Sequence, residues 1–165
     1  MRVTLTILGM ILAGCGSEST NPGWTLQGTV AGYSLQNEAI SAEAHEIEDS
    51  GATITVVNLV NQPGACELVR QNGIANAHLL ALRAGGNAET SYPMTGENAT
   101  KNQAVMLFMV FDAEKNPTTQ VASTSGTLTI TENRLAAGGP LSLHFDAMTP
   151  EGPVSGSLTA PNCVL

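Results

Sequence analysis

Two segments in the last third of the chain alternate apolar and polar residues with a period of two. Leu128 and Ile130 alternate with threonines across residues 127–131, and residues 141–146 read Leu-Ser-Leu-His-Phe-Asp. Strict alternation of this kind is the pattern of a half-buried β-strand, because successive side chains point to opposite faces. Turn-forming residues separate these segments from each other and from a third at 154–160. The pattern therefore predicts β-hairpins.

The rest of the chain favours the same fold class. Residues 53–60 are dense in β-branched residues, and residues 25–35 and 77–83 also have strand composition. Residues 105–111, Val-Met-Leu-Phe-Met-Val-Phe, are apolar at every position. Such a run predicts a central strand that is covered on both faces. We therefore predict one all-β domain, an antiparallel β-sandwich or barrel of about eight strands.

Residues 37–49 fit two patterns. They alternate apolar and polar side chains around Ile40 and Ala44, as in a strand, but Ile40, Ala44 and Ile47 also fall at helical spacing. We favour a strand because the later elements are strands, and the helix stays open as an alternative. Residues 84–102 are predicted to form a long polar loop.

The first 14 residues have the layout of a secretory signal. Arg2 supplies a positive charge, residues 3–12 are mostly apolar, and Ala13 and Gly14 are small. The apolar run is shorter than the roughly 20 residues that a membrane-spanning helix needs. Cleavage as a plain signal peptide is one interpretation.

The residues that follow the apolar run favour a more specific interpretation. Residues 12–15, Leu-Ala-Gly-Cys, resemble the lipobox of bacterial lipoprotein precursors. The resemblance implies that the signal at 1–14 is removed and that Cys15 is lipidated. Residues 15–23 are then a flexible lipidated tether, and residues 24–165 are the β-sandwich domain. No aspartate follows the cysteine, which by the sorting rule of enteric bacteria implies the outer membrane. Two or three acyl chains make such an anchor permanent.

Lipidation of Cys15 would leave Cys66 and Cys163 as the remaining cysteines. In an oxidising compartment the two are expected to form a disulfide. It would close a loop of about 100 residues and stabilise the domain by roughly 4–5 kcal/mol in the chain-entropy model. Two free buried thiols are the alternative.

The charge balance restricts the possible partners. Without Arg2 the chain has five basic residues against 14 acidic ones, a formal charge of −9. Binding of nucleic acid depends on Lys and Arg that neutralise phosphates, so nucleic acid is not an expected partner. Docking to anionic lipid through a basic patch is disfavoured for the same reason.

Ser142, His144 and Asp146 suggest a catalytic triad at first sight. On a strand, however, alternate side chains stand roughly 6.5–7 Å apart and parallel. A nucleophile must lie within about 2.6–3.2 Å of its base. We therefore predict a polar outer face of a hairpin strand.

Glu43 and His45 share a face if residues 37–49 form a strand, and together with His78 or His144 they are candidate metal ligands. A third ligand at a defined spacing is missing from the sequence, so we predict no metal site. His78 is expected to be a hydrogen-bonded edge or core histidine. No catalytic set and no cofactor are predicted, and we do not expect an enzyme.

Several further segments resemble small, uncharacterised, β-rich lipoproteins of gliding soil bacteria. These segments are residues 28–32 (Gly-Thr-Val-Ala-Gly), Cys66, residues 125–129 (Ser-Gly-Thr-Leu-Thr) and residues 155–163 (Ser-Gly-Ser-Leu-Thr-Ala-Pro-Asn-Cys). The resemblance implies a β fold and the disulfide, and it carries over no activity.

These observations predict a membrane-anchored lipoprotein of the cell envelope with a non-enzymatic role. The role would be structural or would consist in binding another envelope protein. The alternative is a lipocalin-like carrier of a small apolar ligand, because Met106, Phe108, Met109 and Phe111 could line a cavity.

Overall fold

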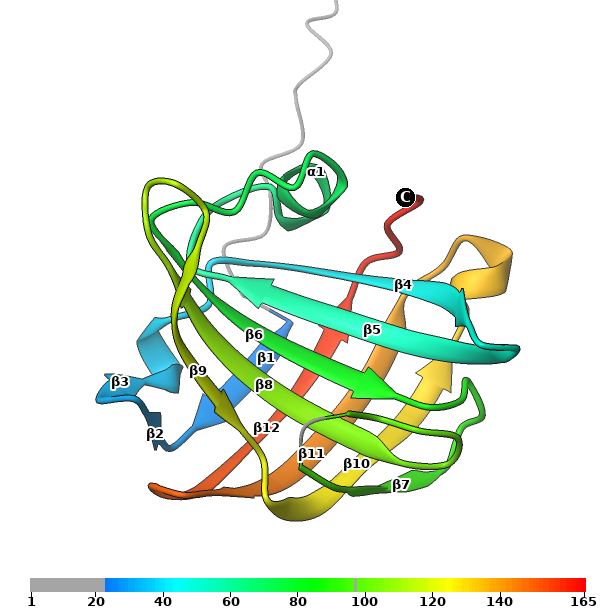
Figure 1. Ribbon diagram of the computed structural model, residues 1–165. Coiled ribbons are helices and arrows are strands. Elements are labelled where there is room, and N and C mark those ends of the chain that lie inside the picture. The colour runs from blue at the N-terminus through cyan, green and yellow to red at the C-terminus, as the bar shows by residue number, and fades with distance from the viewer. Residues whose placement is uncertain (1–22, 97) are drawn as a thin grey trace, which may run out of the picture.

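One ten-stranded mixed sheet curls on itself into a half-barrel (Figure 1). The computed structural model describes residues 23–96 and 98–165. The expectations for the signal, for Cys15 and for most of the tether lie outside the described residues.

The strands of the sheet follow the order β1-β12-β11-β10-β7-β8-β6-β5-β4, and β9 pairs with β8. Their bounds are β1 Trp24–Gln27, β4 Ser41–Asp49, β5 Ala52–Val60, β6 Ala77–Ala84, β7 Ser91–Met94, β8 Ala104–Phe111, β9 Pro117–Ala122, β10 Ser125–Asn133, β11 Leu141–Thr149 and β12 Gly152–Ala160. The strands β2 (Thr29–Val30) and β3 (Tyr33–Ser34) form a separate hairpin. The helical elements are η1 (Leu35–Asn37), α1 (Ala65–Arg70) and η2 (Leu135–Ala137).

Two walls of this sheet face each other. The front wall in Figure 1 consists of β4, β5, β6, β8 and β9, and the rear wall consists of β1, β12, β11 and β10. The short strand β7 joins the walls, since it pairs with β10 on one side and with β8 on the other. The prediction left a sandwich or a barrel open, and the structure has one continuous curled sheet instead of two sandwiched sheets.

Most predicted strands are confirmed, among them β5, β6, β8, β10, β11 and β12. Residues 41–49 form the strand β4, so the helical alternative for this stretch is wrong. Residues 25–35 are divided into β1, β2, β3 and the start of η1 instead of one strand. The break comes from Ala31 and Gly32, whose positive φ angles (53° and 80°) make the tight turn between β2 and β3.

Three features differ from the predicted all-antiparallel strand set. The expected long loop at 84–102 contains β7, whose Met94 pairs with Ala104 of β8 in parallel. Strand β9 was not predicted, because it begins with Pro117 and its next three residues are polar. Helix α1 was not predicted either, because six residues are too few to show a helical period.

Apolar side chains pack on both faces of the front wall. On the inner face, Met106 and Phe108 of β8 join a large cluster that fills the space between the walls. On the outer face, Val105 and Leu107 of the same strand join a second cluster with Val60 of β5. The prediction that residues 105–111 form a central strand covered on each side is confirmed.

The residues that follow β12 hold the two ends of the curled sheet together. The Ala44 N–H of β4 donates to the Pro161 carbonyl (2.8 Å), and the Cys163 N–H donates to the Ala44 carbonyl (2.7 Å). Cys163 also forms a disulfide with Cys66 of α1, with a Cα–Cα distance of 5.5 Å. The predicted pairing of Cys66 with Cys163 is confirmed. We call this junction the seam.

Candidate functional site

The structure does not assemble the triad suggested by Ser142, His144 and Asp146. The three side chains occupy every second position of β11 and share its outer face, where His144 and Asp146 are exposed. Ser142 Oγ bonds to Thr159 Oγ1 of β12 at 2.9 Å, and among the described residues no hydrogen bond joins the three. The prediction of a polar outer face is confirmed. Similar hydroxyl pairs continue across the rear wall, such as Thr25 with Ser157 (2.9 Å).

Glu43 and His45 of β4 do interact, on the outer face of the front wall. Glu43 is completely buried and His45 is 6% exposed. His45 Nδ1 lies 2.8 Å from Glu43 Oε2, and the Asn58 amide of β5 donates to Glu43 Oε1. Asn58 lies directly opposite Glu43 in the strand register, which places its amide at the carboxylate. Because a carboxylate accepts hydrogen bonds, it orients the imidazole with Nδ1 as the donor.

The second ring nitrogen of His45 faces a surface groove. No residue that the structure describes bonds to Nε2, and among the same residues no buried side-chain nitrogen or oxygen lacks a partner. His45 Nε2 is therefore not fully buried, and the His45 ring lines the groove between α1 and the front wall. The buried Glu43 holds the ring, so Nε2 is presented in a fixed position to whatever occupies the groove.

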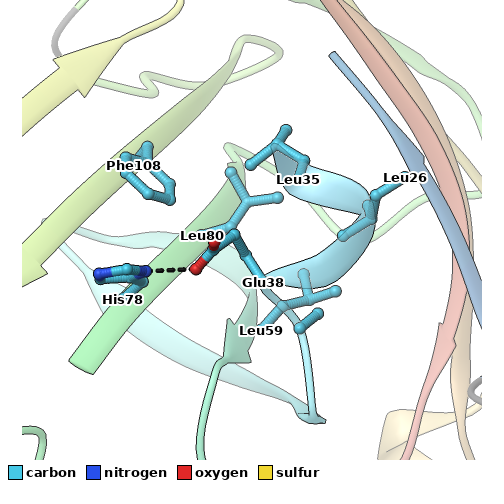
Figure 2. A pocket seen from close by; sticks show the side chains of 8 residues that line it. Leu26, Leu35, Glu38, Leu59, His78, Leu80 and Phe108 are labelled. Atoms are coloured by element: carbon cyan, nitrogen blue, oxygen red, sulfur yellow. Dashed lines mark hydrogen bonds and ion pairs between the residues drawn. The ribbon is translucent and has the colours of Figure 1, made fainter. Parts of the chain in front are cut away.

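His78 and Glu38 form a second pair, on the inner face (Figure 2). His78 Nδ1 bonds to Glu38 Oε2, and the ring of Tyr33 lies over the imidazole at a centroid distance of 4.1 Å. The predicted hydrogen-bonded histidine is thus confirmed for His78. His78 lies on the opposite face of the wall from His45, and His144 lies on the rear wall. These histidines therefore do not form one metal site.

The cavity beside His78 is too small for an organic ligand. Its volume is about 10 Å³, and buried side chains such as Leu35, Leu59 and Phe108 occupy its walls (Figure 2). A cavity of this size holds roughly one water molecule. Ligand pockets for drug-sized molecules measure about 300–1,000 Å³.

A larger depression, which we call the outer groove, crosses the outer face of the front wall. Its two adjoining parts have volumes of about 240 Å³ and about 510 Å³, and Ile47 and Arg83 line both parts. The first part runs beneath α1, and the second runs between the β4–β5 turn and residues 98–101. Val56 and Ile54 of β5 lie along its floor. The outer groove is therefore elongated and largely apolar at its base.

Helix α1 forms one wall of the outer groove, and local contacts fix its position. The helix begins after Gly64, whose φ of 81° is left-handed, and the Ala65 N–H donates to Ser41 Oγ of β4 at 3.0 Å. It ends at Arg70, and Asn72 just beyond it has a left-handed φ of 48°. The Gly73 N–H then donates to the Leu68 carbonyl at 2.7 Å, as in a Schellman motif. The disulfide at Cys66 ties the same helix to the seam.

Residues 98–101 form the opposite wall, and a close backbone approach holds them. The Gly85 N–H, just after β6, donates to the Gln103 carbonyl, and the Asn102 N–H donates to the Gly85 carbonyl, both at 2.7 Å. A Cβ atom at residue 85 would lie 1.8 Å from the Thr100 carbonyl oxygen. Only glycine permits this approach, so Gly85 sets the far wall of the outer groove.

The outer groove also collects cationic side chains. Arg70 and Arg134 pair with Glu67 (3.1 Å) and Glu132 (2.6 Å). The other three cations that the structure describes are Arg83, Lys101 and Lys115, and none of them pairs with a described carboxylate. All three line the outer groove. In a chain with a formal charge of −8, a groove that gathers three cations without a described carboxylate partner is unexpected.

The strand register places His45 and Arg83 in one row across the sheet. His45 of β4 lies opposite Val56 of β5, and Val56 lies opposite Arg83 of β6. Adjacent strands are about 4.8 Å apart, so the His45 and Arg83 backbones are separated by roughly 10 Å across the apolar Val56. Arg83 can donate to a carboxylate above Val56, whereas Nε2 of a neutral His45 ring whose Nδ1 donates to Glu43 is an acceptor and suits a hydrogen-bond donor.

Other functional features can be stated for the described part of the chain. It contains no cluster of three or more metal-ligating His, Cys, Asp or Glu side chains. Within the same residues, no helix is long and apolar enough to cross a membrane. No family model, no curated protein and no solved structure matches the chain.

The sequence interpretation found His45 and Glu43 but missed the residues that complete the site. Asn58 lies within a β-branched run and carries no separate signal. Arg83, Lys101 and Lys115 are isolated in sequence, and only the sheet order and the returning loops bring them to one face. Glu38, the partner of His78, was overlooked because 40 positions separate the two residues.

Proposed function

We propose that the protein is a lipid-anchored, non-enzymatic binding protein of the cell envelope. In this proposal Cys15 carries the lipid in the outer membrane, and the domain binds another envelope protein. The lipobox-like residues 12–15 support the anchor. The disulfide between Cys66 and Cys163 supports an oxidising compartment outside the cytoplasm.

The outer groove is the observation that carries the binding role. Its apolar floor is bordered by unpaired cations, which a purely structural surface does not need. The space between the walls, in contrast, is filled by packed apolar side chains. The lipocalin-like carrier therefore has no observation in its favour, and we do not propose it. For the fold, we propose that the hydrogen bonds and the disulfide of the seam close the half-barrel into a barrel.

Intact mass spectrometry of the membrane-extracted protein tests the anchor. We expect a mass that fits a chain starting at Cys15 with attached acyl groups, and an increase by two hydrogens on reduction. A Cys15→Ala variant should lack the acyl mass and leave the membrane fraction. An unmodified wild-type chain in the soluble fraction would rule out the anchored role.

A further inference from the structure

The distribution of charge along the outer groove indicates what it binds. Lys115 lines the part beneath α1, Lys101 lines the part beside residues 98–101, and Arg83 lines both. The three unpaired cations therefore follow one another along the groove instead of converging on one point. A small anion would use only one of them.

We propose that the outer groove binds an extended acidic segment of a partner protein, in which carboxylates alternate with apolar side chains. This inference rests on the proposed function as a binding protein. Successive side chains of an extended segment point to opposite sides, so a segment that lies on its edge in the groove can turn its apolar side chains toward Ile47 and Ile54 and its carboxylates toward the cations.

The floor of the outer groove suits the apolar side chains of such a segment. Ile47 is 40% exposed, and it lies where the two parts of the groove meet. It neighbours Ile54, its partner in the β4–β5 register, which is 8% exposed. Burial of Ile47 by a ligand would remove apolar surface from water, which favours binding.

The polar groups of the outer groove suit carboxylates. Arg83 lies opposite Val56 in the β5–β6 register and lines both parts of the groove. The guanidinium can bind a carboxylate through two N–H groups. Asp49 also lines the groove, at the β4–β5 turn, so we expect this end to disfavour a carboxylate. The binding segment should thus be acidic near Arg83 and Lys115 and neutral near Asp49.

Fluorescence anisotropy with two labelled peptides tests this inference. The probe is Leu-Asp-Leu-Glu-Leu-Asp-Leu, and its uncharged twin is Leu-Asn-Leu-Gln-Leu-Asn-Leu. Both are added to the full-length protein in nonionic detergent with the disulfide intact. We expect the acidic peptide to bind at least tenfold more tightly than its twin, and binding to weaken as salt is added.

Matched charge variants locate the binding. Arg83→Gln should weaken binding of the acidic peptide by roughly 2–5-fold, as expected for an exposed ion pair. The combination with Lys101→Gln and Lys115→Gln should weaken it by roughly 10–100-fold. The control Arg134→Gln removes a cation that pairs with Glu132 and should leave the affinity within about twofold.

Three results would overturn the inference: equal binding of both peptides, an equal effect of Arg134→Gln and Arg83→Gln, or displacement of the peptide by an equal concentration of acetate. The last would indicate a site for a single small anion. Any of these results leaves the anchored role intact if the acyl mass on Cys15 is found. A photo-crosslinking residue at Ile47 and another at Thr129 of the rear wall then distinguish a failure of the acidic-segment inference from a failure of the proposed binding role. A partner protein crosslinked from Thr129 alone would retain the binding role on another face.

Discussion

Glu43 is an acidic residue in a position where an unpaired charge would be costly. It has no exposed surface, and its two carboxylate oxygens are occupied by His45 and Asn58. Buried charges persist in proteins when their hydrogen-bonding capacity is satisfied. The arrangement therefore gives His45 a rigid support beneath the outer groove.

Tyr92 of β7 gives a residue-scale prediction about pH. Its side chain is buried and its hydroxyl donates to the Ala88 carbonyl at 3.1 Å. Burial raises the pKa of Tyr92 above its ordinary value of 10.0. The unfolded chain thus loses this proton at a lower pH than the folded chain. The contribution of Tyr92 to the free energy of unfolding is complete below about pH 10 and is lost as the pH rises toward the folded-state pKa.

Urea denaturation from about pH 9 to about pH 11 measures this effect. We expect the free energy of unfolding to fall over this window, by no more than about 1.4 kcal/mol per pH unit from this one group. Tyr92→Phe should show a shallower fall over the same window, because it has no proton to lose there. Equal slopes for both proteins would contradict the prediction.

At the scale of elements, the sequence predicts strands that have one polar and one apolar face. It does not predict the short elements, such as β7 and α1. The alternation in β10 and β11 reports directly on which face is buried, and the structure agrees at Leu128 and Ile130. Strand β7 has four residues and contains Pro93, which weakens its strand signal. Helix α1 is held by the disulfide and by the Ser41 hydroxyl, and neither contact is visible in its own short sequence.

The candidate site was predictable only in part for a related reason. The pairing of Glu43 with His45 follows from a spacing of two along one strand. The remaining groups of the outer groove come from β6, α1 and two loops. Their proximity depends on the sheet order, which includes the parallel pair of β7 and β8 that no hairpin pattern indicates.

Gly85→Ala tests the far wall of the outer groove. The added methyl group would lie 1.8 Å from the Thr100 carbonyl oxygen, so residues 98–103 must move. We expect a loss of about 1–3 kcal/mol in the free energy of unfolding, measured in urea. Gly96→Ala is the control, because nothing lies within 4 Å of its added Cβ atom. A similar small change in both variants would show that the wall tolerates the methyl group.

At the scale of the whole molecule, the disulfide links α1 to the seam across a sequence separation of 97. We expect the double variant Cys66→Ala and Cys163→Ala to lose about 2–5 kcal/mol in the free energy of unfolding. Denaturation of the wild type in the presence of a reductant should give a similar loss. The double variant itself should be insensitive to the reductant. A wild-type stability that the reductant does not change would contradict this role.

The seam also has a consequence for the order of events in biosynthesis. Ala44 leaves the ribosome early, but its partners at residues 161–163 are made after almost the entire domain. Until they arrive, the edge of β4 carries unpaired backbone groups, which attract strands of other chains. Closure also requires contacts between distant parts of the chain, which slow folding. The nascent polypeptide therefore exposes the backbone of Ala44 at the edge of β4 until residues 161–163 pair with it.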